Sequence, residues 1–438
     1  MKKYALLIIG IFLSISVVNA KTTDLYEMMK SNAVSDEQIN FNQQSSDTNG
    51  KGIYVFSSTK NDTHPIYYYR GNVNNNIAYK GFCWQVVRTT ENGGIKVIYR
   101  GKLKADGSCY AGGEDVWAAQ AKYGDANSAY AVGYMYTLPE ETGENLHDSP
   151  LKAATDAWFE ANMLDYLDEI EDAVYCNDRS RVEGETDYYS SNNRLNPMGG
   201  NNVVKPSLEC TNKADRFTVS SSLGNGKLKY PVGNITADEV VLAGAIYETQ
   251  NSDSYIFVNK FWTMTPHSTT KALYPNSLGA LNRNNFNYST GVRPVITLKA
   301  AHFNTGDGSV ATPYNITDKT YDITTNPQVL AALNTNVKEA RPGDTVTLSV
   351  KNVSKGYGFG SIVLYDGEGN KIALELTEVS EGVYEFTMPE SDVYVDVILT
   401  TVNPETYDNT SIIVIILIVS TIFLAVLYTL KKGVEKFE

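Results

Sequence analysis

Two apolar stretches without a charged residue, 4–18 and 411–430, lie near the two ends of the 438-residue sequence. The first stretch follows Lys2 and Lys3, and the small residue Ala20 comes shortly after it. This is the layout of a secretory signal peptide over residues 1–20. The second is long enough for a transmembrane helix, which spans about 30 Å at about 1.5 Å per residue. Lysines follow it, so the positive-inside bias places its tail in the cytoplasm and the preceding residues outside the cell.

Between these stretches, short runs rich in Tyr, Val and Ile alternate with turn-forming residues. They predict strands over residues 53–56, 66–70, 82–89, 95–99, 255–258, 261–264 and 292–298. Asn92-Gly93 joins two of these runs as a hairpin, since this pair readily adopts a tight turn.

Helices are fewer and shorter than strands in this pattern. Ser149 and Pro150 open one helix, whose periodicity continues over 164–173, and the capping box of Thr236 and Glu239 opens another. The polar segment 21–51 predicts a short helix at 24–30 followed by a linker. We therefore expect an α+β fold, in which residues 52–317 form a large strand-rich domain with a few short helices.

The pattern changes after Asp318, where short alternating strands are separated by Gly-containing turns. The pattern predicts strands over residues 345–350, 362–365, 371–376, 383–388 and 393–399. Regular short strands of this kind predict a small β-sandwich over residues 318–402.

A sorting motif precedes the C-terminal apolar stretch. Asn403-Pro404-Glu405-Thr406, the apolar span and the basic tail together resemble the cell-wall sorting signal of Gram-positive surface proteins, over residues 403–438. The resemblance implies that a sortase attacks the carbonyl group of Thr406 and transfers the chain to the cell wall. The commoner motif begins Leu-Pro and ends in Gly. The alternative is an ordinary membrane anchor, in which the C-terminal helix is retained.

Two further resemblances concern the folded regions. Trp262-Thr263-Met264-Thr265-Pro266 and the later run 291–298 (Gly-Val-Arg-Pro-Val-Ile-Thr-Leu) look like the end of an uncharacterised Firmicutes-type surface domain. This ending is also similar to the C-type-lectin-like fold. Residues 386–393 and 341–344 resemble parts of bacterial surface repeat domains, which implies that the β-sandwich is a spacer.

Charge and cysteine content narrow the class of protein. The formal net charge of −13 does not suit binding of nucleic acid through a basic patch. Four cysteines in a secreted chain indicate two disulfides, for which three connectivities exist. We favour Cys83 with Cys109 and Cys176 with Cys210, since these pairs close the shorter loops. The alternative, a zinc site with all four cysteines as ligands, lacks any C-x-x-C spacing.

The sequence contains no recognisable catalytic motif. The four histidines lack metal-ligand spacing and no G-x-S-x-G motif is present, so we expect no catalytic residue, metal or cofactor. The acidic residues of 165–172 are interpreted as a solvated helix face rather than as the paired carboxylates of a glycosidase.

Aromatic and amide side chains gather in one region of the large domain. Aromatic rings stack on the apolar faces of sugars and amides bond their hydroxyl groups. The candidate ligand-binding residues are Trp262, Tyr274, Asn282, Asn284, Asn287 and Tyr288. We expect residues 282–288 to be exposed; the alternative is a loop rich in turn-forming Asn.

These observations favour a secreted, non-enzymatic, adhesin-like binding protein that recognises glycans and is held at the cell wall or plasma membrane. Its expected partners are the sortase, the wall, a ligand on a neighbouring surface, and the membrane through the C-terminal helix. Two alternatives remain open: a surface enzyme acting on glycans or peptides, and a purely structural wall protein.

The sorting motif generates a first prediction. Thr406→Ala should move the protein from the fraction released by a wall hydrolase to the fraction released by detergent, because the variant lacks the residue that the sortase joins to the wall. Immunoblotting of the two fractions measures this shift. Detergent release of the unaltered protein with Glu438 intact would show instead that the chain is a simple membrane protein.

Overall fold

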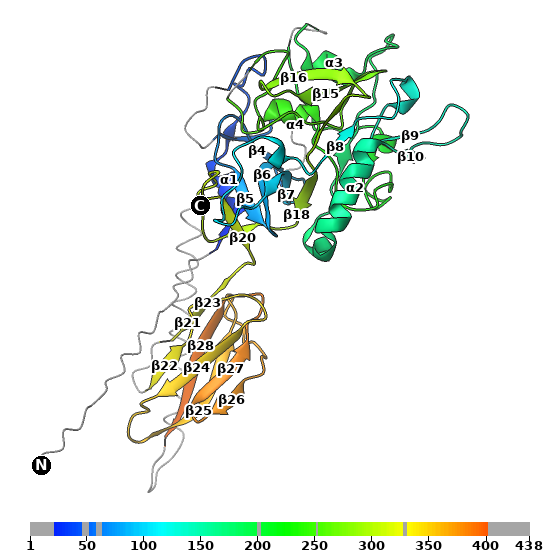
Figure 1. Ribbon diagram of the computed structural model, residues 1–438. Helices are drawn as coiled ribbons and strands as arrows, with labels where there is room; N and C mark the ends of the chain where they lie inside the picture. Colours follow the sequence, from blue (N-terminus) through cyan, green and yellow to red (C-terminus); the bar gives the residue numbers. More distant parts are fainter. Residues whose placement is uncertain are drawn as a thin grey trace, which may run out of the picture. The chain divides into compact units, whose positions relative to one another are not determined.

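The computed structural model describes residues 22–45, 52–57, 64–198, 203–250, 253–326 and 331–401, which form two compact units. The first unit is Thr22–Thr317, and the second begins at Asp318 (Figure 1). The expected signal peptide, sorting motif and C-terminal helix lie outside the described residues. Within the described ranges, no helix is both long and apolar enough to span a membrane.

The first unit is built on a ten-stranded sheet, in which β6 pairs with β4, β5 and β7, and β7 pairs with β18. Its strands are β1 (Thr23–Asp24), β2 (Val34–Ser35), β3 (Ile53–Val55), β4 (Tyr67–Tyr69), β5 (Asn76–Tyr79), β6 (Phe82–Thr89), β7 (Ile95–Lys102), β18 (Val295–Leu298), β19 (His302–Phe303) and β20 (Tyr314–Thr317).

Smaller sheets and short helices complete this unit. A four-stranded sheet contains β13 (Ile246–Tyr247), β14 (Pro266–Ser268), β15 (Lys271–Pro275) and β16 (Ala280–Asn285). Three strand pairs are β8 (Ala119–Lys122) with β17 (Ser289–Val292), β9 (Met135–Tyr136) with β10 (His147–Asp148), and β11 (Tyr175–Cys176) with β12 (Arg216–Phe217). The helices are α1 (Leu25–Asn32), α2 (Pro150–Asn162), α3 (Ser190–Leu195), α4 (Ala237–Leu242) and the 3-10 turns η1 (Glu114–Val116), η2 (Ala129–Ala131), η3 (Leu164–Glu169) and η4 (Lys213–Asp215).

The hairpin of β6 and β7 forms the centre of the core, and the structure confirms the strands predicted for it. Gly93 occupies its turn with a φ of +84°, a conformation that glycine adopts without strain. All eight residues of β6 are buried. The Trp158 ring of α2 lies 5.7 Å from that of Trp84 and 5.0 Å from that of Tyr99, in edge-to-face geometry, so this helix is packed on the hairpin through aromatic rings.

Both predicted helix starts are confirmed. The Ser149 hydroxyl accepts a hydrogen bond from the Lys152 amide at the start of α2, and Thr236 and Glu239 cap each other at the start of α4. The continuation predicted over 164–173 is only the 3-10 turn η3, which ends at Glu169. Figure 1 shows α4 beside β15 and β16, so the four-stranded sheet and the capped helix lie together.

Three predictions in this unit were wrong. Residues 255–258 and 261–264 form turns and one isolated bridge rather than strands, although most of their apolar side chains are buried, Phe257 and Val258 being partly exposed. The strand predicted over 292–298 is divided between β17 and β18. Pro294 lies at the division; it has no amide hydrogen for a sheet ladder. The adjacent Arg293 is fully buried and donates to the carbonyl oxygens of Tyr99 and Ile256.

The linker expected over 21–51 is also corrected, because residues 22–45 belong to the large unit. β1 pairs with β19, and β2 pairs with β3 in the main sheet. Between them, α1 is capped by Asp24 and has Leu25 and Met29 fully buried. Two apolar side chains on an otherwise polar helix are therefore enough to anchor it on the core.

The second unit consists of two four-stranded sheets around a common apolar core, as expected for the β-sandwich. Figure 1 shows its strands in two layers. One sheet has the order β23-β21-β28-β25 and the other β22-β24-β27-β26. The strands are β21 (Tyr321–Thr325), β22 (Ala332–Thr335), β23 (Glu339–Ala340), β24 (Thr345–Lys351), β25 (Tyr357–Tyr365), β26 (Thr377–Ser380), β27 (Val383–Thr387) and β28 (Val393–Thr401).

Buried residues alternate along β24 and β28, as expected for strands with one face on a core. The strand predicted over 371–376 is wrong, since only Lys371 forms a bridge there. β21 lies beside β28 in parallel orientation, so the first and last strands of this unit are neighbours in one sheet.

Both expected disulfides are present in the large unit. Cys83 of β6 is bonded to Cys109, in the loop after β7, and Cys176 of β11 is bonded to Cys210. Each bond closes a short loop, with sequence separations of 26 and 34 residues. Such bonds are typical of proteins that fold in an oxidising compartment.

The disulfides generate a second prediction. Replacing Cys83 and Cys109 together by Ser should lower the free energy of unfolding by about 3.5 kcal/mol, because the unfolded chain gains loop entropy. Chemical denaturation of the full-length protein in detergent measures the loss. Ser108→Ala, beside the disulfide in sequence, is the control. Equal stability of the double variant and the unaltered protein would contradict the prediction.

Candidate functional site

Four of the candidate ligand-binding residues lie together on β15, β16 and the turn after β16. Tyr274 is the cross-strand neighbour of Asn282, and the Asn284 side chain lies near the Tyr274 hydroxyl. The Tyr288 ring lies 6.1 Å from that of Tyr274. All four side chains are partly exposed. We call these four residues the tyrosine–asparagine patch.

Trp262 forms the base of this patch and is not one of its surface residues, which corrects the prediction. Its side chain is fully buried, and its indole N–H donates to the Ala121 carbonyl oxygen at 3.1 Å. Its ring lies edge-to-face with Tyr274 at 5.6 Å and with Tyr288 at 6.2 Å. Trp262 therefore holds the two tyrosine rings from below and does not reach a ligand.

The rest of the segment 282–288 contains both buried and exposed residues. Phe286 is fully buried and stacks on Tyr123 at 5.1 Å, so the expectation that the whole segment is exposed is wrong at this residue. Asn287 is exposed in the turn, and its backbone amide donates to the Asn127 side chain. On the other side of the patch, the Lys260 ammonium donates to the Tyr288 hydroxyl at 2.8 Å.

A second site in the same unit, which the sequence analysis missed, is a cavity of about 600 Å³. Its described lining includes seven carboxylates and four cationic side chains. These residues come from β6, β7, α4, the segment after η3 and the region around the Cys176–Cys210 disulfide. We call it the acidic cavity. It lies elsewhere than the tyrosine–asparagine patch, since none of the four patch residues lines it.

Three buried charges meet at the wall of this cavity. Arg88 of β6 and Lys96 of β7 are cross-strand neighbours, and both donate to the same carboxylate oxygen of Glu239, at 2.8 and 2.6 Å. The other oxygen of Glu239 accepts from the Thr236 amide at 3.0 Å. We call Arg88, Lys96 and Glu239 the buried triad, since their side chains are at most 8% exposed.

The electrostatics of the buried triad keep Glu239 ionised. Burial by itself raises the pKa of a carboxyl group, but the ammonium of Lys96 and the guanidinium of Arg88 outweigh burial and lower the pKa of Glu239 to about 2. A carboxyl group with this pKa has no proton to donate at neutral pH. Glu239 thus neutralises buried cations and does not act as a general acid.

The remaining carboxylates differ in their partners. Arg194 of α3 makes a two-pronged ion pair with Asp238, with both N–O distances under 3 Å, and also contacts Asp178 at 2.7 Å. Asp172 accepts only backbone amides, those of Val219 and Ser220, and Glu171 accepts from Thr90 and Asn92. Neither Glu171 nor Asp172 forms an ion pair with a described residue. These two carboxylates therefore have no directly bonded cation among the described residues.

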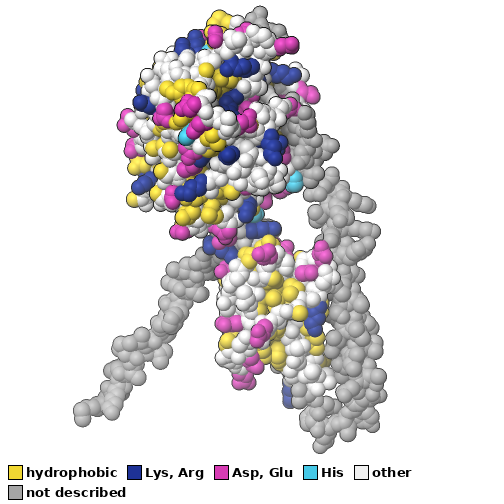
Figure 2. Space-filling model, turned by 90° about the vertical axis from the view of Figure 1, so that its right-hand side faces the viewer, with side chains coloured by type: hydrophobic (Ala, Val, Ile, Leu, Met, Phe, Trp, Pro, Cys, Tyr) yellow, Lys and Arg dark blue, Asp and Glu magenta, His cyan; other side chains and the backbone are white. Residues whose placement is uncertain are grey.

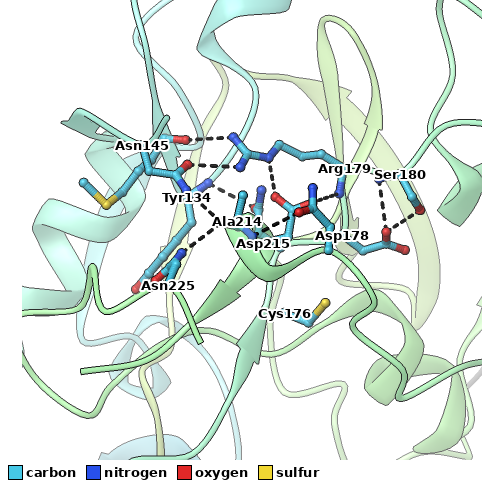
Figure 3. A network of polar contacts seen from close by, with 12 residues as sticks. Tyr134, Asn145, Cys176, Asp178, Arg179, Ser180, Ala214, Asp215 and Asn225 are labelled. Carbon is cyan, nitrogen blue, oxygen red and sulfur yellow. Dashed lines mark hydrogen bonds and ion pairs between the residues drawn. The ribbon is translucent and has the colours of Figure 1, made fainter. Parts of the chain in front are cut away.

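A network of polar contacts fixes the loops beside the disulfide (Figure 3). Arg179 donates to the carboxylate of Asp215 and, at 3.0 Å, to the side chain of Asn145. The amide groups of Asn145 and Asn225 both donate to the Ala214 carbonyl oxygen. Because Asp215 is buried, these bonds are poorly accessible to water and hold the cavity wall in position.

Histidines contribute nothing to the described lining of the cavity. His267 is buried and accepts from or donates to the Tyr247 hydroxyl at 3.2 Å. Burial, with Arg283 and Lys271 nearby, lowers the pKa of His267 to about 3, so its ring is neutral at neutral pH. Among the described residues, no group of His, Cys, Asp and Glu side chains is arranged to hold a metal ion.

Charge on the surface is not concentrated in one field. Figure 2 shows acidic and basic side chains interspersed over the face in view. The acidic character of the cavity therefore comes from the residues that line it and not from a uniformly acidic surface.

No protein-family model, curated protein or solved structure matches the chain. The resemblances to a sortase-sorted protein, to a surface domain and to a C-type-lectin-like fold accordingly stay predictions.

The buried triad generates a third prediction. Glu239→Gln should lower the free energy of unfolding by about 3–5 kcal/mol, because two buried cations lose their carboxylate. The pKa of Glu239 is depressed from 4.5 to about 2 on folding, so its stabilising contribution is present above pH 4.5 and is lost as pH falls toward 2.

Thermal unfolding of the full-length protein across this pH range measures both effects, with the exposed Glu144→Gln as the matched control. The Glu239 variant should lose part of the acid sensitivity that the control retains. Identical stability and identical pH profiles in the two variants would show that the buried triad contributes nothing.

Proposed function

We propose that this protein is a surface-attached, non-enzymatic binding protein whose large unit recognises glycans and whose β-sandwich is a spacer. Two disulfides support an extracellular location. The two-unit organisation supports a head and a spacer. The attachment itself rests on the sorting motif and the apolar span of the sequence.

The tyrosine–asparagine patch is the observation that carries the glycan proposal. Its two tyrosine rings belong to one aromatic cluster with Trp262, which fixes their orientation before a ligand arrives. Rings held in this way lose little conformational entropy on binding. They supply the apolar surface on which the C–H faces of a sugar stack.

The amides beside the rings supply the polar half of recognition. Asn282 and Asn284 lie on the same side of β16, two residues apart, and each carries both donors and an acceptor for hydroxyl groups. The Lys260 ammonium, bonded to the Tyr288 hydroxyl, adds a donor at the edge of the patch. This combination suits a neutral or acidic sugar rather than a cationic one.

The electrostatics of the acidic cavity favour binding over catalysis. Arg194 is engaged by two carboxylates, and Glu239 is held ionised by two cations. Paired carboxylates for glycoside hydrolysis need one member with a raised pKa. The pKa of Glu239 is shifted in the opposite direction.

The patch generates a fourth prediction. On a glycan array probed with the full-length protein in detergent, Tyr288→Ala and Asn284→Ala should each weaken binding by about 1 kcal/mol or more, the usual cost of a lost stack or hydrogen bond. Tyr288→Phe should retain most of the affinity, because the ring remains.

The matched control is Tyr130→Ala, which removes an exposed tyrosine of the same unit outside the patch. Unchanged affinity in both patch variants would remove the patch from the binding surface. An array on which the unaltered protein binds no glycan would overturn the proposal itself.

A further inference from the structure

Among the described residues, more carboxylates than cationic side chains line the acidic cavity. Seven carboxylates and four cationic side chains line it. Three of the cations are paired with three carboxylates in the buried triad and around Arg194. Glu171 and Asp172 accept hydrogen bonds from hydroxyl, amide and backbone groups and form no direct ion pair with a described residue, so a cation entering the cavity would meet two carboxylates that no described cation contacts directly.

The charge is spread rather than clustered. The described residues include no group of side chains placed to hold a metal ion. Separate carboxylates along a wall suit an ammonium or guanidinium group on a flexible chain better than a compact metal ion, which needs several ligands at one point.

The cavity also offers apolar surface and one unused donor. Phe56, Ile66 and Leu208 belong to a small apolar cluster and line the cavity, where they provide a surface for an aliphatic stem. The side chain of Arg88 donates through Nε to Glu239 and through Nη1 to the Thr89 carbonyl oxygen. No hydrogen bond of Nη2 to a described residue accompanies these two.

We propose that the acidic cavity binds a basic peptide segment. A lysine side chain of the peptide lies along the apolar wall and places its ammonium group near Glu171 and Asp172. A peptide carbonyl oxygen accepts from Nη2 of Arg88. A polyamine supplies the cation but not the acceptor, and an anionic sugar is repelled by the two carboxylates. This site is distinct from the tyrosine–asparagine patch and does not depend on it.

The test uses the full-length protein in detergent and a fluorescent Lys-Gly-Lys-Gly-Lys peptide, followed by anisotropy. Glu171→Gln combined with Asp172→Asn keeps size and hydrogen-bonding groups but removes both charges. It should raise the Kd roughly fivefold or more, the scale of a lost ion pair. Acetylation of the peptide lysines should abolish binding, and high salt should weaken it.

A matched control distinguishes binding by the cavity carboxylates from general attraction to the negative charge of the protein. Glu140→Gln combined with Glu144→Gln removes the same charge from exposed positions outside the cavity and should leave the Kd unchanged. Arg216→Gln removes a cation that lines the cavity and whose side chain has no partner among the described residues. It should lower the Kd about twofold or more by relieving repulsion, an effect in a direction that misfolding does not produce.

Several results would overturn the proposal. Equal weakening by the cavity pair and the control pair would assign binding to general attraction between an acidic protein and a cation. Equal affinity for the acetylated peptide, or no binding to the unaltered protein, would exclude a basic segment. Competitive displacement of the peptide by Ca²⁺ or Zn²⁺ at concentrations below the peptide Kd would assign the cavity to a metal ion instead.

Discussion

The large unit depends on one carboxylate shared by two buried cations. Glu239 forms the capping box of α4 with Thr236, and the same side chain pairs with Arg88 and Lys96 on the central hairpin. Charges taken out of water are tolerated only when all their partners are in place. This requirement fixes α4 relative to β6 and β7, and the wall of the acidic cavity and the sheet above α4 take their positions from it. The interaction thus specifies an arrangement as much as it stabilises one.

Local signals accounted for the parts of the fold that sequence analysis predicted well. These signals are the turn at Asn92-Gly93, the Ser149 cap and the capping box of Thr236. Each acts within a few residues, so it can be recognised without knowledge of the rest of the chain. The wrong strands over 255–258 and 371–376 have a different cause. Apolar residues indicate packing against a core, but only pairing with a neighbouring strand edge makes such a segment a strand, and the sequence does not show which edges are free.

The same distinction separates the two sites. The tyrosine–asparagine patch could be proposed because its members lie within a short stretch of sequence, although residue type could not reveal that Trp262 supports the patch from the core. The acidic cavity could not be proposed, since Arg88, Glu171 and Asp238 are far apart in the chain and meet only after folding. The sequence pattern predicts Glu171 on a solvated helix face, but η3 ends two residues before it, so Glu171 projects from extended chain instead.

The parallel pairing of β21 and β28 bears on how the second unit responds to force. The chain enters this unit just before Tyr321 and leaves it after Thr401, and residues 323–325 pair in parallel with 393–395. In a parallel pair, the start of one strand and the end of the other point in opposite directions along the sheet. Tension between the two ends therefore acts as shear, loading the hydrogen bonds of the pair together instead of opening them one at a time. A domain with this connectivity can carry load along its length even where its thermal stability is modest.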